Sequence, residues 1–212
     1  EEEIQYIPDS REIIVKKTSG HIAKSQSGPV GIALRERTTA AATFEEANPE
    51  IINIGSERRI RSVVTLARAD DSGVIAGSDA VDYLQTDPDK TLGSVVANLD
   101  SCADNNGVTV ECGGIRYSTR MLGSYLLRKV QAEIADSSID DSDIGSVVLT
   151  VPVGKSAASY EAYAVAAAYA NLNVSAYLPE PIAACIGYEV EPNSEPTRVI
   201  VYNLDGESFT AS

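Results

Sequence analysis

The sequence has no long apolar run. No stretch of its 212 residues approaches the roughly 20 apolar residues that a helix needs to span a bilayer. The first residues, Glu1 to Glu3, also lack the basic start and apolar block of a secretory signal peptide. Both absences argue against a membrane protein or a secreted one, and we expect a cytoplasmic protein without a membrane partner.

Cysteine and histidine are also scarce. The three cysteines, Cys102, Cys112 and Cys185, match no zinc-binding spacing, and an odd number argues against a disulfide framework. We therefore expect reduced thiols. The single histidine, His21, has no cysteine or carboxylate cluster around it, so we assign it no role as a ligand or base. No metal site is predicted.

Basic residues are few. The chain has 17 lysines and arginines against 31 acidic residues, a net charge of -14. Such a charge disfavours binding to a nucleic acid backbone and favours attraction to basic partners. Solubility and adaptation to a saline cytoplasm are alternative explanations of the same acidity.

Short β-type runs separated by turn residues dominate the first half. Residues 1–28 are polar and mixed, with one apolar stretch at Ile13 to Val15, and we interpret them as a tail or an extra strand. Strands are predicted at 30–34, 40–44, 51–54 and 63–66, followed by a helix over 77–84 that stops before Pro88, and a hairpin over 108–117.

Helices and strands alternate in the second half. An apolar stripe at Leu122, Leu126, Val130 and Ile134 predicts one helix, with Ser118 as its N-cap. Ser156 caps an alanine-rich helix that ends at Asn171, a residue suited to the left-handed conformation. Strands are predicted at 147–151, 174–178 and 199–204, and a helix at 181–188.

This order of elements predicts an α/β fold with a mixed five-stranded sheet flanked by helices, as in the ribonuclease-H-like fold. That fold carries nucleases, sugar kinases, actins and chaperones, so it does not fix the function. The last predicted strand, 199–204, would lack a hairpin partner if the chain ended at Ser212. Its open edge then favours pairing with another chain, including a dimer through this strand.

One segment resembles the DnaK-type heat-shock chaperone family without a gap. Val151 to Tyr188 shares the family's pattern of strand, alanine-rich helix, strand and E-P-x-A-A, here Glu180 to Ala184. Weaker matches to the family lie at Gly31 to Leu34, 55–64, 77–88 and 199–212, and all the matches occur along the chain in the same order as in the family. The resemblance implies an actin-like ATPase domain, with its first lobe at 29–190 and the first strand and turn of a second lobe at 197–212.

The resemblance also implies which residues would handle a nucleotide. The family's first strand has a carboxylate that organises the metal and then a small Gly-Thr-Thr turn that approaches the phosphates. Here Gly31 matches, but Ala33 stands at the carboxylate position, and Arg35, Glu36 and Arg37 replace the small turn. Bulk and like charge are therefore added to the first phosphate turn.

The other positions of the site are altered as well. The catalytic lysine of the family aligns with Val96, and the metal-side aspartate of the second phosphate turn aligns with Asn203. Of that turn, Gly206 is kept and a serine, Ser208, replaces a threonine. Glu180 persists, either as part of the family's coupling network or as a carboxylate stabilised at a helix N-terminus.

These replacements favour a degenerate, pseudo-ATPase relative without a cofactor or catalytic residues. Its partners would be proteins, for example chaperones or ribosome-associated factors. One alternative is an active ATP-dependent chaperone or sugar-kinase-like enzyme that binds ATP and magnesium through atypical residues such as Arg35 and Arg37. Another is a structural subunit that docks through residues 1–28.

Overall fold

The central sheet is mixed, as the sequence predicts. The structure, a computed structural model, describes residues 29–45, 48–67, 73–100, 109–137, 145–188, 190, 198–205 and 208–212. The main path of the sheet has the strand order β11-β10-β1-β2-β3. Its strands are β1 (Val30–Leu34), β2 (Thr38–Glu45), β3 (Asn48–Ile52), β10 (Val147–Val151) and β11 (Val174–Pro179). The short β4 (Ile60–Arg61) pairs with β2 as a sixth strand.

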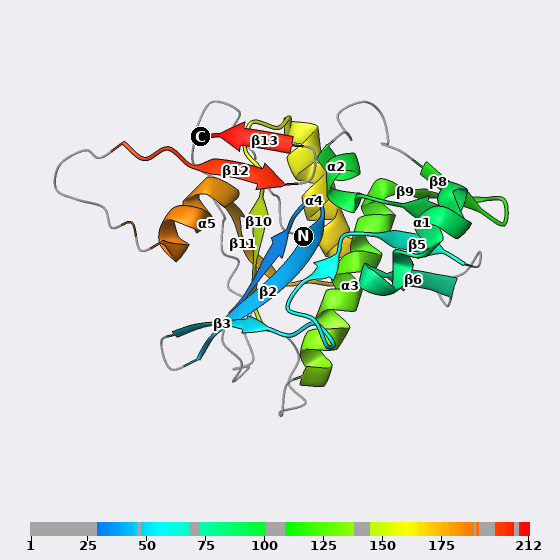
Figure 1. The fold of residues 1–212 in the computed structure, drawn as a ribbon, viewed down its shortest axis with the longest axis horizontal. Coiled ribbons are helices and arrows are strands. Elements are labelled where there is room, and N and C mark those ends of the chain that lie inside the picture. Colours follow the sequence, from blue (N-terminus) through cyan, green and yellow to red (C-terminus); the bar gives the residue numbers. More distant parts are fainter. Residues whose placement is uncertain are drawn as a thin grey trace.

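Strand direction divides the sheet at β1. On one side, β1 pairs in parallel with β10, and β10 in parallel with β11. On the other side, β2 and β3 continue the sheet in antiparallel pairs. Parallel neighbours need a crossover connection, which the helices of the second half supply. Figure 1 shows the helices packed around this sheet, with the smaller β-elements at one end of the molecule.

Two long helices form the main packing layer. Helix α3 (Thr119–Ser137) buries the predicted stripe of Leu122, Leu126, Val130 and Ile134. Helix α4 (Ala157–Tyr169) begins after Ser156, whose hydroxyl accepts a hydrogen bond from the Ser159 backbone N–H. It ends before Asn171, which has φ of 56°. The predicted caps are thus confirmed, because both depend on local hydrogen bonding and backbone conformation.

A smaller group of strands packs against α3. It contains the three-stranded sheet β6-β5-β7 and the hairpin β8–β9, whose turn is Gly113 and Gly114. Its elements are β5 (Val64–Leu66), β6 (Val74–Ala76), β7 (Thr91–Leu92), β8 (Thr109–Cys112) and β9 (Ile115–Ser118). A short helix, α2 (Val95–Asp100), contacts both α3 and α4.

The prediction of one helix over 77–84 is wrong. The chain instead forms a 3-10 turn, η2 (Gly77–Ala80), then a separate helical turn, α1 (Tyr83–Thr86), and a second 3-10 turn, η3 (Pro88–Lys90). Gly77 has φ of 87°, which a continuous α-helix does not use. The hydroxyl of Thr91 donates to the Asp87 carbonyl oxygen at 2.8 Å, which stabilises this irregular segment.

The expectation that the last strand has no hairpin partner is also wrong. Strand β12 (Tyr202–Asp205) pairs antiparallel with β13 (Ser208–Ala211). Hydrogen bonds between the backbones of Val201 and Ser212 extend the ladder by one more pair. The rings of Tyr202 and Phe209 stack across the hairpin, with centroids 6.1 Å apart. The argument for a dimer through an unpaired last strand therefore loses its basis.

Several other predictions can be placed. Helix α5 (Glu180–Gly187) lies where a helix is predicted. Cys112 and Cys185 are free, as expected, whereas Cys102 and the tail of residues 1–28 lie outside the described residues. The domain boundaries at 29–190 and 197–212 stay predictions. Within the described part of the chain, no helix is long and apolar enough to cross a membrane.

Candidate functional site

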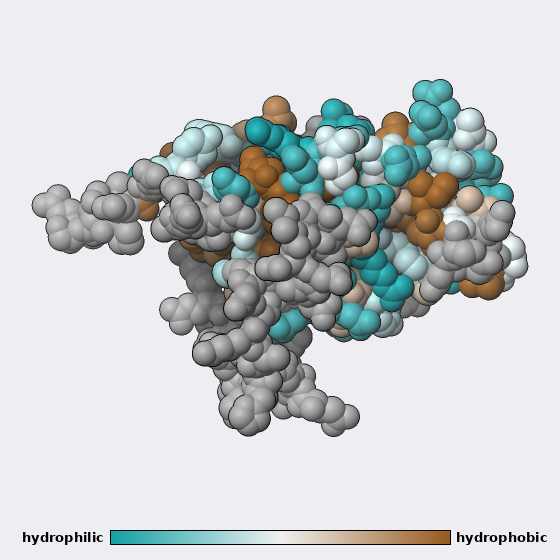
Figure 2. Space-filling view, turned by 90° about the horizontal axis from the view of Figure 1, so that it is seen from below, coloured by the Kyte–Doolittle hydropathy of each residue, from teal (hydrophilic) through white to brown (hydrophobic). Residues whose placement is uncertain are grey.

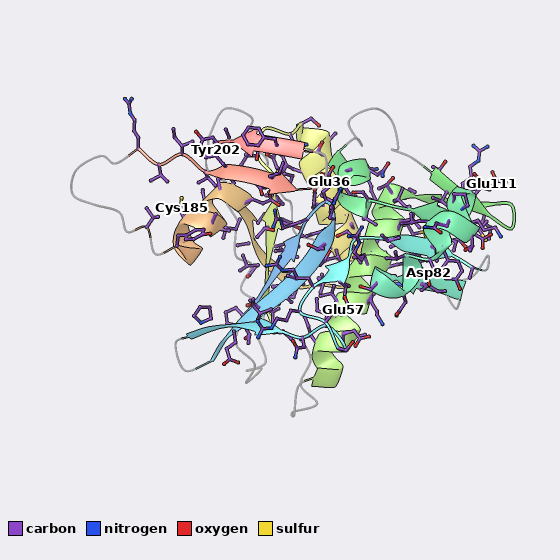
Figure 3. All side chains as sticks on the ribbon, viewed as in Figure 1. Glu36, Glu57, Asp82, Glu111, Cys185 and Tyr202 are labelled. Carbon is purple, nitrogen blue, oxygen red and sulfur yellow. The ribbon has the colours of Figure 1, made fainter. Side chains whose placement is uncertain are left out.

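The turn between β1 and β2 is held in place by serine hydroxyls. Arg35 donates its backbone N–H to the Thr38 carbonyl oxygen at 3.2 Å, which closes the turn. Ser62 donates its hydroxyl to the Arg35 carbonyl oxygen at 2.7 Å, and Ser94 donates to the Glu36 carbonyl oxygen at 2.9 Å. Two carbonyl groups of the turn are thereby fixed to segments that precede β5 and α2. Figure 3 shows Glu36 in this turn, on the side of the sheet where β12 lies.

Three residues far apart in the sequence form one polar chain beside this turn. The Arg35 guanidinium donates to the Asn203 side-chain oxygen at 2.8 Å. The Asn203 amide nitrogen in turn donates to Glu180 Oε2 at 2.9 Å. Both contacts are partly buried. The Arg35–Asn203–Glu180 chain therefore connects the β1–β2 turn, the β12–β13 hairpin and the start of α5.

The charges, donors and acceptors of the Arg35–Asn203–Glu180 chain match one another. A cation lies at one end, a carboxylate at the other, and the carboxamide between them offers an acceptor to the first and a donor to the second. Hydrogen bonds to charged groups contribute about 1.5–3 kcal/mol in favourable settings, and less where solvent reaches them. An aspartate at position 203 could accept from Arg35 but could not donate to Glu180. The asparagine thus suits this arrangement.

The remaining predicted positions lie in different environments. Gly31 and Ala33 lie within β1 and are half-buried, and Arg37 is exposed in the turn. Val96 is only 4% exposed and belongs to the hydrophobic core. Ser208 begins β13, and Gly206 lies outside the described residues. Hydrogen bonds thus bring together Arg35, Asn203 and Glu180, while Val96 packs in the interior.

A magnesium ion fits these residues poorly. Mg²⁺ prefers hard oxygen ligands in a regular octahedral arrangement, often with phosphate oxygens. Here the Asn203 oxygen already accepts a hydrogen bond from Arg35, and the guanidinium of Arg35 repels a divalent cation. Among the described residues, no group of three or more histidine, cysteine, aspartate or glutamate side chains could hold a metal.

Sequence reasoning missed the residues that hold the first turn. Ser62 is fully buried, and its hydroxyl also lies 3.0 Å from the Thr39 hydroxyl. Ser94 is half-buried and precedes α2, where it also accepts from the Ala97 backbone N–H at 3.2 Å. Serine is common in turns and caps, so neither residue carries a sequence signal for this role. Only the tertiary arrangement reveals it.

Comparison with known proteins identifies the family. The chain is similar to the proteins named "Chaperone protein DnaK" from two strains of Halobacterium salinarum, R1 and NRC-1. Identity to each is 26% over 183 residues, which covers 86% of this chain and 28% of the relative. The chain thus spans under a third of the length of these relatives. The Hsp70 protein family matches residues 89–212, more than half of the chain. Together with the mixed sheet and its flanking helices, this match shows that the chain belongs to the Hsp70 family.

Proposed function

We propose that this chain is a degenerate member of the Hsp70 family that acts through protein contacts, as a co-chaperone or scaffold, rather than through ATP hydrolysis. The Arg35–Asn203–Glu180 chain is the observation that carries the proposal. Its partners would be proteins such as other chaperones or ribosome-associated factors, and its setting would be the cytoplasm.

The polar chain supports the proposal because it joins the two turns that would approach the phosphates. In the family resemblance, the turn after β1 and the β12–β13 hairpin form the phosphate cradle. Here Arg35 extends from the β1–β2 turn to Asn203 on β12, with 2.8 Å between the donor nitrogen and the acceptor oxygen. A nucleotide that entered between them would have to break a partly buried, charge-assisted contact.

The chemistry of the replaced residues supports it further. Ala33 cannot organise a metal or its water, and Val96 offers no positive charge and is buried. Removing one preorganised electrostatic contribution typically lowers the rate of an enzyme by about 100- to 1000-fold. The loss of several such groups leaves little catalysis.

Steady-state ATP hydrolysis provides the test. We expect the complete natural protein to release no more phosphate from ATP and magnesium than a buffer blank. A matched control is the Glu180→Gln variant, which removes the carboxylate and should leave the rate at the same background. Turnover above background that disappears in Glu180→Gln would contradict the proposal.

A second candidate function has one observation in its favour. The guanidinium of Arg35 lies at the site, and arginine can bind phosphate through two parallel hydrogen bonds. An active chaperone could then hold ATP through Arg35 and Arg37. This reading predicts that ATP raises the thermal stability of the protein, since a ligand that binds only the folded state stabilises it.

The Arg35→Ala/Arg37→Ala variant separates the two readings. We expect the same small or absent change in Tm with ATP for the variant and for the unaltered protein, measured by differential scanning fluorimetry. A matched control is Arg58→Ala/Arg59→Ala, which removes the same charge at two exposed positions elsewhere. A Tm increase with ATP that is lost only in the first variant would favour the active chaperone.

A further inference from the structure

A shallow groove runs along α3, away from the polar chain. Its first part has a volume of about 390 Å³ and lies between β9, the start of α3 and the end of α4. The residues that line it include Arg116, Met121, Tyr125, Arg128 and Tyr169. Tyr125 and Arg128 also line an adjoining hollow of about 280 Å³ beside β6, together with Lys129. We call the two together the α3 groove.

Three cationic side chains line the α3 groove, although the protein as a whole is acidic. The chain has a net charge of -14, yet Arg116, Arg128 and Lys129 line the groove. None of its described lining residues is an aspartate or glutamate. Lys129 is paired with Glu133 and Asp79, so the two arginines are the cations most available to a ligand. The two exposed arginines can attract an anionic group locally, although acidic neighbours balance much of the charge around them.

Arg128 is held in position before any ligand binds. Its guanidinium carbon lies 5.6 Å from the centre of the Tyr125 ring, a cation–π distance. One of its nitrogens donates to the Tyr169 carbonyl oxygen at 2.6 Å. Tyr125 itself is 6% exposed, so the ring is a fixed support. A guanidinium has five N–H donors, so several stay available to a carboxylate, and fixing it beforehand lowers the entropy cost of binding.

Arg116 is weakly engaged. Its Nε lies 3.6 Å from Glu111 Oε2, and the two side chains are 77% and 60% exposed. Exposed pairs of this kind contribute about 0–1 kcal/mol, so an incoming carboxylate can compete with Glu111. Figure 3 shows Glu111, the partner of Arg116, at the end of the molecule opposite Cys185 and Tyr202.

Apolar surface accompanies the two arginines. Met121 is 36% exposed and Tyr169 is 53% exposed, and both exposed fractions are larger than those of residues that pack in the core. Arginine, tyrosine and methionine are the residue types enriched where proteins bind each other. Figure 2 shows hydrophobic and hydrophilic residues next to each other on the molecular surface, so apolar exposure alone does not mark the groove. Its combination of fixed arginines and apolar side chains does.

We propose that the α3 groove binds an acidic segment of a partner protein, with aspartate or glutamate on Arg116 and Arg128 and an apolar side chain against Met121 and Tyr169. The groove is open and shallow, which suits an extended peptide better than an enclosed small molecule. Nucleic acid is disfavoured because the rest of the acidic surface repels a polyanion. The inference does not depend on whether the polar chain at Arg35 excludes ATP.

Fluorescence anisotropy with a defined probe tests this proposal. The probe is a fluorescein-labelled peptide of aspartate and serine with a central leucine, at about 0.15 M salt. We expect micromolar binding to the unaltered protein. Arg116→Glu/Arg128→Glu should weaken it by about tenfold or more, which corresponds to ~1.4 kcal/mol. The same peptide with lysine in place of aspartate should not bind.

A matched variant controls for total charge. Arg58→Glu/Arg59→Glu makes the same change in net charge at exposed positions outside the groove, and we expect it to alter binding by less than about twofold. Equal weakening in both double variants, or no binding of the acidic peptide, would overturn the proposal. So would a labelled single-stranded DNA that binds in the groove more tightly than the peptide. Thermal unfolding of each variant confirms that it is folded.

Discussion

Tyr163→Ala is expected to lower the free energy of unfolding by about 3–5 kcal/mol, the range for removing a large buried aromatic side chain. Tyr163 lies on α4 and is 0% exposed, so it is among the largest fully buried side chains of the described residues. Alanine would leave a cavity between α4 and its neighbours, because a close-packed interior collapses only in part. Urea unfolding followed by circular dichroism measures the change.

The same helix provides the control. Tyr169 lies six residues further along α4 and is 53% exposed. Tyr169→Ala removes the same atoms from a position that solvent already reaches, and we expect a change within about 0.5 kcal/mol. Similar losses in both variants would show that α4 does not pack as described.

Gly123→Leu is expected to destabilise the protein by about 3 kcal/mol, the upper part of the range for overpacked cores. Gly123 is buried on α3 where α2 and α4 approach. A Cβ at this position would lie 3.2 Å from Ala166 Cβ and 3.4 Å from Leu99 Cδ1. A leucine must therefore push α3 away from both helices, and urea unfolding again measures the effect.

A reciprocal pair of variants tests the steric cause separately from helix propensity, which rises when a helical glycine is replaced. Gly123→Ala improves the helix propensity of α3 by about 1 kcal/mol but crowds Ala166. Combining it with Ala166→Gly relieves the crowding, so the two changes should not be additive. Additive free energies would argue against direct contact between α3 and α4 at this point.

The parts of the fold that depend on local chemistry follow from the sequence. The stripe of α3, the serine cap of α4 and the left-handed Asn171 are all set by neighbours within a few residues. The alternation of helix and strand in the second half predicts the parallel side of the sheet, because parallel neighbouring strands need a helical crossover between them. The α3 stripe repeats one preference along a helix, whereas the cap and Asn171 are single positions with a strong local preference.

The parts that depend on distant contacts do not follow. The strand predicted at 63–66 is confirmed as β5, but its neighbours β6 and β7 have only three and two residues, too short to give a period. Helix α2 is six residues long, and the apolar run around it indicates equally a strand. The hairpin β12–β13 was missed because the mixed sequence of β13 gives little strand signal.

The candidate site could also be predicted only in part, because its hydrogen bonds depend on distant contacts. Family resemblance points to Arg35, Glu180 and Asn203 as separate altered positions, but not to the hydrogen bonds among them. Arg35 and Asn203 are 168 positions apart, and their hydrogen bond exists only because the fold brings the β1–β2 turn close to β12. The resemblance also aligns Val96 with a residue of the nucleotide site, whereas the structure shows Val96 on α2, buried in the core.

We infer that the replaced residues and the Arg35–Asn203–Glu180 chain prevent nucleotide binding in this member of the Hsp70 family. Isothermal titration of the complete natural protein with ATP and magnesium tests it most directly. We predict no heat beyond dilution at micromolar to millimolar ATP. A saturable binding curve with a micromolar Kd, abolished by Arg35→Ala/Arg37→Ala, would contradict the account and favour an active chaperone that holds ATP through its arginines.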